Sequence, residues 1–232
     1  MSQQLYISGE YLNKNPTWHV EESPWKAQQI LRMLTLHHLT PRSICEVGCG
    51  AGEVLKQLQE QMDERCLFWG YDISPQAVRL AHSRANARLQ FKLADIGEEK
   101  DAFFDLIAVM DVLEHLPDYY SFLAMLKPHS RYKIFHVPLD LSVQTVLRSH
   151  GLLNVREWYG HLHYFTKETA LEMFKEARYN VLDYFYTARA LETPTHDLGR
   201  KLLRLPRQAI SVINQDFAAR LLGGWSLLVL AE

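Results

Sequence analysis

The sequence predicts an α/β protein whose core is a mostly parallel sheet of seven strands with helices on both faces. From Ser43 onward, short apolar runs alternate with helical patterns, which is typical of βα units. Glycines separate the first apolar run from the first helical pattern, and acidic residues follow several of the runs. With 47% hydrophobic and 22% charged residues among 232, the composition is that of a globular protein.

The N-terminal segment, residues 1–39, precedes this alternation and is expected to form an arm or cap of the same domain. Within it, Ser23 fits an N-cap and Pro24 the first helical position, so a helix is expected to run to about His38. The aromatic residues before Ser23 are then expected to lie on a loop.

The rest of the chain, residues 40–232, is expected to carry the sheet, with an insertion at about 139–164. Runs of strand length bounded by turn signals predict the strands, and helical periodicity after a turn or a capping residue predicts the helices. The arm and the insertion are the two additions that the pattern indicates. The expected strands are Ile44–Val47, Leu67–Asp72, Leu89–Ala94, Leu106–Asp111, Tyr132–Val137, Val181–Tyr186 and Ser226–Leu230, and the expected helices are Glu53–Met62, Pro75–Ala87, Tyr119–Leu126 and Lys167–Ala177.

A glycine-rich turn follows the first strand. Gly48, Gly50 and Gly52 are spaced G-x-G-x-G, Glu46 precedes them, and a helix is expected from Glu53. Glycines adopt positive φ and let the backbone approach a ligand, while a helix N-terminus presents unpaired N–H groups. The spacing differs from the G-x-G-x-x-G of dinucleotide-binding proteins, which argues against an NAD(P)-dependent dehydrogenase.

Carboxylates also follow the second and third strands. Asp72 and Ile73 end the second, and Asp95 and Ile96 end the third. Open α/β sheets bind ligands at the carboxyl ends of their strands. Asp72 could instead cap the next helix, but Ser74 is better placed for that role. Three acids at three successive strand ends therefore indicate a binding site along this edge.

These motifs resemble those of class I methyltransferases that use S-adenosylmethionine (SAM), which have a Rossmann-like sheet. The resemblance implies that Glu46 holds the glycine loop and the methionine ammonium, and that Asp72 binds both ribose hydroxyls. It also implies that Ile73 packs on adenine, while Asp95 and the backbone of Ile96 bind its edge. The cofactor would be SAM, with S-adenosylhomocysteine (SAH) as product, held by Glu46, Gly48, Cys49, Gly50, Gly52, Asp72, Ile73, Asp95, Ile96 and Asp111.

Two later stretches resemble a narrower group of these enzymes. Residues 111–118 read D-V-L-E-H-L-P-D and residues 160–166 read G-H-L-H-Y-F-T, as in small-molecule methyltransferases of quinone and methionine pathways. The resemblance covers about residues 40–187 and implies O- or N-methylation of a small metabolite. A catalytically silent SAM-binding protein would keep the same strand-end acids, so that alternative stays open.

Histidines are the candidates for general acid–base catalysis. Methyl transfer demands positioning above all, and a general base matters where the acceptor is a hydroxyl or an ammonium. The strand-end motifs leave the methyl group open to water, so the arm and the insertion are expected to face each other across the acceptor pocket. The catalytic candidates are His115, His19 and His163, and the substrate candidates are Tyr11, Trp18, His161 and Tyr164.

A metal site is the alternative interpretation of Asp111, Glu114, His115 and His161. The pattern resembles the E-x-x-E-H plus His site of metal-dependent 2′-O-methyltransferases that act on RNA 3′ ends, and of some quinone O-methyltransferases. Carboxylates and imidazoles can hold Mg²⁺, Mn²⁺ or Zn²⁺. However, Asp111 replaces the first Glu, and similar sequences occur in relatives without a metal, so a metal-free small-molecule enzyme is the leading hypothesis.

Charge and composition limit the classes of partner that the protein is expected to bind. The formal net charge is −2, so no basic field indicates nucleic acid, and a small-molecule acceptor is expected. No stretch is apolar and long enough for a membrane span or a signal peptide. Three cysteines, Cys45, Cys49 and Cys66, suit core positions in a reducing compartment, so a cytoplasmic protein is expected. The pattern leaves a monomer and a homodimer equally open.

Overall fold

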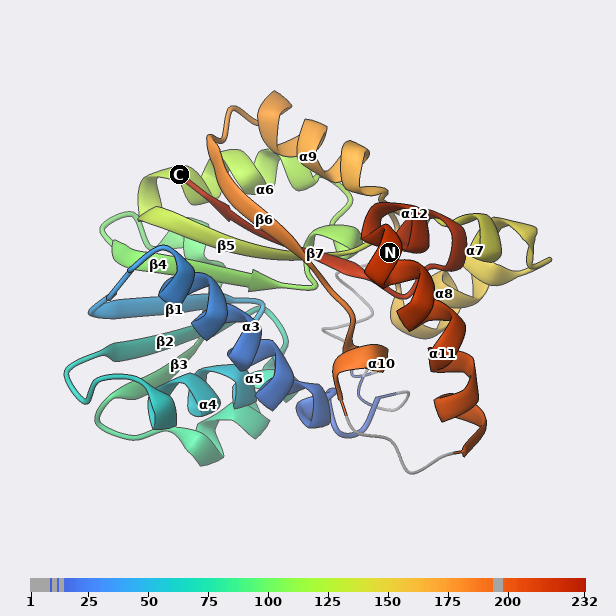
Figure 1. Ribbon diagram of the computed structural model, residues 1–232. Coiled ribbons are helices and arrows are strands. Elements are labelled where there is room, and N and C mark those ends of the chain that lie inside the picture. The colour runs from blue at the N-terminus through green and yellow to red at the C-terminus, as the bar shows by residue number, and fades with distance from the viewer. Residues whose placement is uncertain (1–8, 10–11, 13–14, 194–197) are drawn as a thin grey trace.

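The computed structural model describes residues 9, 12, 15–193 and 198–232, and it contains the seven-stranded sheet that the sequence predicts. The strand order is β3-β2-β1-β4-β5-β7-β6 (Figure 1). The first five strands are parallel, and β7 is antiparallel to both β5 and β6. The strands are β1 (Ser43–Val47), β2 (Leu67–Asp72), β3 (Leu89–Leu93), β4 (Phe104–Met110), β5 (Ser130–Pro138), β6 (Val181–Thr187) and β7 (Ser226–Ala231).

Helices cover both faces of the sheet because its central strands are apolar on both sides. In β4, Ile107 and Val109 pack in the cluster that includes α6 (Tyr119–Leu126) and α9 (Lys167–Glu176). Leu106 and Ala108 pack in the opposite cluster. That second cluster includes α3 (Ser23–Leu36), α4 (Glu53–Gln61) and α5 (Pro75–Ala81), which lie together in Figure 1. The alternation along one strand thus produces a three-layer fold.

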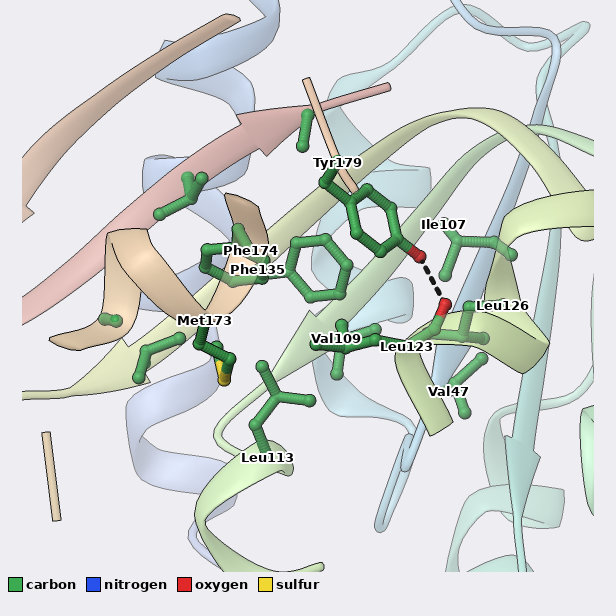
Figure 2. Packing of buried hydrophobic residues seen from close by; sticks show 14 of the residues in the cluster. Val47, Ile107, Val109, Leu113, Leu123, Leu126, Phe135, Met173, Phe174 and Tyr179 are labelled. Carbon is green, nitrogen blue, oxygen red and sulfur yellow. Dashed lines mark hydrogen bonds between the residues drawn. The ribbon is translucent and has the colours of Figure 1, made fainter. Parts of the chain in front are cut away.

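Aromatic side chains pack between the sheet and helices α6 and α9 (Figure 2). The ring of Phe135 lies 4.8 Å from that of Phe174 and 5.5 Å from that of Tyr179, measured between centroids. The buried Tyr179 hydroxyl donates a hydrogen bond of 2.8 Å to the carbonyl of Leu123. A buried phenol with an acceptor avoids the free-energy penalty of an unsatisfied polar group, so this contact fixes α6 against the rest of the core.

The helix predicted from Pro75 to Ala87 is shorter than expected. The α-helix ends at Ala81, and a 3₁₀ turn, η2 (His82–Arg84), follows it. The chain must then reverse into β3, and Asn86 forms an antiparallel bridge with Leu89. This reversal stops the helix before Ala87. The other short turns are η1 (Val20–Glu22), η3 (Ile96–Glu98), η4 (Leu113–His115) and η5 (Lys127–His129).

Three segments are added to the core, where the sequence indicated only two. The N-terminal helix α3 begins one residue earlier than predicted: Ser23 is its first residue and not its N-cap, Glu22 precedes it without a side-chain capping hydrogen bond, and the helix ends at Leu36. The insertion folds into α7 (Val143–Leu147) and α8 (Gly151–Tyr159). The third addition joins β6 to β7 and contains α10 (Arg189–Glu192), α11 (Leu198–Ile213) and α12 (Gln215–Leu222). Within the described residues, no helix has the length and apolarity needed to cross a membrane.

Candidate functional site

A cavity of about 530 Å³ lies where β1, β2, β4 and β5 end. One part of its wall, here called the strand-edge half, is formed by the loop after β1 and the end of β2. The other part, the covering half, is formed by residues 18–26, α8, α10, the turn before β7 and His161. The cavity volume is within the range typical of small-molecule sites.

The glycine loop of the strand-edge half has a backbone that other residues would not adopt without strain. Gly48 and Gly50 have φ of 75° and 53°. A Cβ on Gly48 would lie 2.6 Å from Val112 Cγ2, and one on Gly50 would lie 2.6 Å from Trp18 Cδ1. The backbone N–H of Gly48 donates to the Tyr71 carbonyl at 2.8 Å, which ties the loop to β2. Glycine is therefore required both by φ and by close approach.

Two buried carboxylates flank this loop. Asp72 Oδ2 accepts a hydrogen bond from the Gly50 N–H and Oδ1 accepts one from the Ser74 N–H, both at 2.8 Å. Burial raises the pKa of Asp72. Burial also raises the pKa of Glu46 to about 8, although Lys26 opposes the shift. Glu46 Oε2 is buried and has no hydrogen-bond partner among the described residues, so it can receive a donor from a ligand.

A partly buried ion pair links the arm to the end of β4. Lys26 Nζ lies 2.7 Å from Asp111 Oδ2, and His136 Nδ1 lies 2.5 Å from Asp111 Oδ1. The other His136 nitrogen, Nε2, lies 2.8 Å from the Thr187 hydroxyl. Burial would raise the pKa of Asp111, but His136 and Lys26 outweigh it and hold that pKa well below its usual range. Asp111 itself has a φ of 56°, so a local cluster of partners holds a strained residue.

A second polar cluster lies further along the wall. The N–H groups of Leu162 and His163 donate to the Glu114 carbonyl at 2.7 and 3.2 Å, which fixes the late loop against η4. This brings His161 Nε2 to 4.0 Å from Glu114 Oε1, while His115 Nε2 lies 3.8 Å from the same oxygen. Burial, reinforced by His161, lowers the pKa of His115 to about 3. The ring is therefore neutral at pH 7.

Side-chain contacts hold the covering half in place. Glu192 of α10 accepts hydrogen bonds of 2.8 Å from Trp25 Nε1 and from Gln29 Nε2. Arg189 Nη2 lies 3.1 Å from Glu22 Oε1. These contacts join the first turns of α3 to the third addition. The arm is thereby positioned over the cavity by residues more than 160 positions away in the sequence.

The arm also faces α8. The His19 ring lies 6.0 Å from the Tyr159 ring, and Tyr159 lies 5.9 Å from His161, measured between centroids. Trp18 and His19 have φ of 50° and 56°, which places two non-glycine residues in the left-handed region. The two segments expected to enclose the acceptor thus meet at the cavity.

The structure brings most of the predicted site residues to this cavity. Twelve of them line it: Glu46, Gly48, Cys49, Gly50, Asp72, Ile73, Asp111, Trp18, His19, His161, His115 and Glu114.

Six predicted residues lie elsewhere or are not described. Asp95 Oδ1 accepts the Gly97 N–H at 2.9 Å and caps η3, Ile96 is fully buried, and Gly52 packs on Phe91. None of these three lines the cavity. His163 Nε2 donates to the Leu116 carbonyl at 2.9 Å, and the Tyr164 hydroxyl donates to the Leu152 carbonyl at 3.0 Å. Tyr11 lies outside the described residues.

Sequence reasoning missed Lys26, Asp140 and Arg189, which all line the cavity. Asp140 follows the fifth strand, so the strand-end rule that identified Asp72 could have found it. Lys26 directly precedes Ala27, which belongs to the buried stripe of α3 that begins at Ser23, so its helical position indicated the edge of the inward face. Nothing local marks Arg189, because its place depends on how α10 packs.

Comparison with known proteins agrees with this geometry. The family described as Methyltransferase domain matches residues 19–184. Ajmaline N-methyltransferase from Rauvolfia serpentina is 33% identical over 90 residues, which are 36% of this chain and 30% of that enzyme. The chain thus spans under a third of that relative's length.

Solved structures of low sequence identity share the fold. N-methyltransferase NodS from Bradyrhizobium japonicum WM9, in complex with SAH, has a TM-score of 0.56 at 19% identity, covering 89% of this chain and 84% of that chain. The plantazolicin methyltransferase BpumL, in complex with a monoazolic desmethylPZN analog and SAH, has a TM-score of 0.58 at 16% identity, covering 100% and 93%.

Proposed function

Because the chain belongs to the methyltransferase domain family, we propose that it transfers the methyl group of SAM to an oxygen or nitrogen atom of a small-molecule acceptor. The observation that carries this proposal is the continuity of the cavity. It begins at the glycine loop and Asp72, and it extends to His115 and His161 beneath the arm. One cavity therefore offers a place for a donor and a place for an acceptor side by side.

The residues of the strand-edge half fit SAM. Glu46 Oε2 is a buried acceptor without a partner among the described residues, and it can receive the methionine ammonium. Asp72 faces the cavity and can bind the ribose hydroxyls, with Ile73 beside it. The loop passes so close to Val112 and Trp18 at Gly48 and Gly50 that a Cβ has no room there, which fits a glycine loop built around a ligand. Asp95 would contribute to adenine binding, as the resemblance implies, only if the cavity reaches it on binding.

The remaining residues orient the acceptor and exclude water. SAM supplies an electrophilic methyl group on a sulfonium, and transfer to it requires an acceptor atom in line. His115 and His19 both line the cavity, and His19, which belongs to the covering half, is the candidate to accept a proton from a hydroxyl or ammonium. Trp18 and Trp25 offer apolar surface to the body of the acceptor. Catalysis would then rest on positioning, with a base from the covering half.

The side chains of the cavity wall also indicate the chemical class of the acceptor. The mixture of aromatic and imidazole side chains suits a moderately apolar molecule with one hydroxyl or amine. The net charge of −2 favours such a molecule over RNA, whose binding depends on basic residues. The three cysteines are buried free thiols, as a reducing compartment permits, so we place the protein in the cytoplasm.

Titration calorimetry with SAH tests the proposal. Asp72→Ala should weaken SAH binding about ten- to a hundredfold, because charge-assisted hydrogen bonds to the ribose are lost. Asp95→Ala is the matched control, since this strand-end acid does not line the cavity and should have a smaller effect. Wild-type protein that binds NADH but not SAH would contradict the proposal, as would unchanged SAH affinity in Asp72→Ala.

A further inference from the structure

The carboxylate of Glu114 is an unusual group for a protein interior. Its side chain is fully buried, and among the described residues neither oxygen has a hydrogen-bond partner. Leaving a buried acceptor unsatisfied costs about 1–3 kcal/mol, and more for a charged group. Such a group calls for a ligand, and Glu114 lies in the cavity wall where one can reach it.

His161 presents a lone pair to this carboxylate. Its Nδ1 lies 2.7 Å from Asp140 Oδ2, so Nδ1 carries the proton that this hydrogen bond needs. In the neutral ring, Nε2 is then an acceptor, and it faces Glu114 Oε1 at 4.0 Å. Two acceptors turned toward each other are stabilised by a cation between them. A carboxylate that fixes the tautomer of a histidine is also the usual outer partner of a metal ligand.

His115 completes the group. Its Nε2 lies 3.8 Å from Glu114 Oε1, and its ring meets that of His161 edge to face at 4.8 Å between centroids. One ligand atom from each of Glu114, His115 and His161 lies within 4.8 Å of the others. Tetrahedral ligands with bonds near 2.1 Å are about 3.4 Å apart, so small side-chain shifts would bring these three to bonding distance.

We propose that Glu114, His115 and His161 bind one divalent transition-metal ion, and that Asp140 positions His161 for it. Two imidazoles and a carboxylate suit Zn²⁺, Co²⁺ or Mn²⁺ better than Mg²⁺ or Ca²⁺, which prefer oxygen ligands. Three protein ligands leave a coordination position open, as in catalytic rather than structural sites. All three ligand residues line the cavity, so the open position would be able to take an oxygen or nitrogen atom of the acceptor.

The structure removes Asp111 from the ligand set that the sequence suggested. Both of its oxygens are engaged, one by Lys26 and the other by His136. This site does not depend on the proposed methyl donor.

Cobalt titration of the metal-free protein, residues 1–232, tests the proposal. Co²⁺ should bind in a ratio of one per chain and give visible d–d absorption, and Zn²⁺ should displace it while Mg²⁺ does not. Glu114→Gln, which keeps the shape of the side chain, should lose the absorption band. Asp140→Asn should weaken binding about 10- to 100-fold, as expected for an outer partner.

His163→Ala is the matched control, because this histidine lies two residues from His161 but its Nε2 bonds the Leu116 carbonyl. This variant should bind Co²⁺ like the wild type. Failure of the wild type to bind Co²⁺, or equal binding by Glu114→Gln, would overturn the proposal. SAH titration of the same samples separates the two claims: SAH binding without Co²⁺ binding overturns only the metal site, and the reverse overturns only the methyltransferase assignment.

Discussion

The two halves of the cavity are built in different ways. In the strand-edge half, backbone groups determine the geometry: the Gly48 N–H bonds the Tyr71 carbonyl, and the Gly50 N–H bonds Asp72. In the covering half, side chains distant in sequence hold the wall, as when Glu192 accepts hydrogen bonds from Trp25. The first half therefore follows from local sequence, while the second depends on tertiary packing.

The two halves of the cavity also suit different ligands, a constant cofactor in one and a variable acceptor in the other. A wall of backbone groups and glycines admits few substitutions, which suits a cofactor that never changes. A wall of side chains on added segments can vary without disturbing the sheet, which suits a variable acceptor. Lys26 connects the two, because it belongs to the arm but pairs with Asp111 at the end of β4.

The largest effect is expected where the halves meet. Lys26→Met should lower the free energy of unfolding by about 2–3 kcal/mol, because Asp111 loses one partner of a partly buried ion pair. Urea denaturation measures this. Lys56→Met is the matched control, since Lys56 pairs with Glu60 on an exposed helix face and its loss should fall within experimental error. Equal losses in both variants would show that Lys26 does not join the halves.

A pH effect should distinguish Glu46 from ordinary surface carboxylates. Its pKa is about 8 in the folded protein against an ordinary value of 4.5, so between these values the folded state holds a proton that the unfolded chain releases. Stability should therefore fall as pH rises through this window, by on the order of 2 kcal/mol. Urea midpoints at about pH 5 and pH 8 measure the slope. Glu46→Gln should reduce it, and an identical slope in that variant would contradict burial of this carboxyl.

The glycine loop gives a sharper test of the strand-edge half. Gly50→Ala should weaken SAH binding about tenfold or more, because the new Cβ would press on Trp18 at a positive φ. Gly224→Ala shares the positive φ, but nothing lies within 4 Å of its Cβ, so it isolates the backbone strain. If calorimetry finds the same SAH affinity in both variants, close approach at Gly50 is not what shapes the site.

The smallest effect should be confined to the covering half. Glu192→Ala removes the acceptor shared by Trp25 and Gln29 and should lower global stability by only about 1 kcal/mol. Hydrogen exchange should accelerate at residues 20–30 and 188–193 while β1 stays protected. Glu172→Ala, which removes an exposed pair with Lys175, should leave exchange in the arm unchanged. Faster exchange in β1 would show that the halves are not independent.

Sequence patterns predicted those parts of the fold that depend on local backbone structure. All seven strands were predicted, and the start of α3 to within one residue, because apolar runs and a Ser-Pro pair are local signals. The capping role predicted for Ser23 was wrong, since Ser23 is already helical. Cys45, Cys49 and Cys66 are buried, as expected. The placement of Asp72 beside the glycine loop was also predictable, since parallel strands end at one edge.

The covering half could not be predicted to the same depth. Helix α10 and the turn before β7 line the cavity, and their place depends on how β6 and β7 pair with the rest of the sheet. His163 and His161 look equivalent in the sequence. The hydrogen bonds of the late loop to the Glu114 carbonyl turn only His161 into the wall. Which of these two histidines faces the cavity therefore depends on tertiary contacts, and no local sequence pattern encodes them.

A crystal structure of the protein with SAH tests the central claim most directly. The account predicts density with the ribose hydroxyls at Asp72 and the amino group at Glu46 Oε2. It also predicts a space left beside the sulfur atom that is lined by His115 and His161. Density for SAH that lies in the covering half, or that leaves Asp72 without a contact, would contradict the division of the cavity into a donor half and an acceptor half.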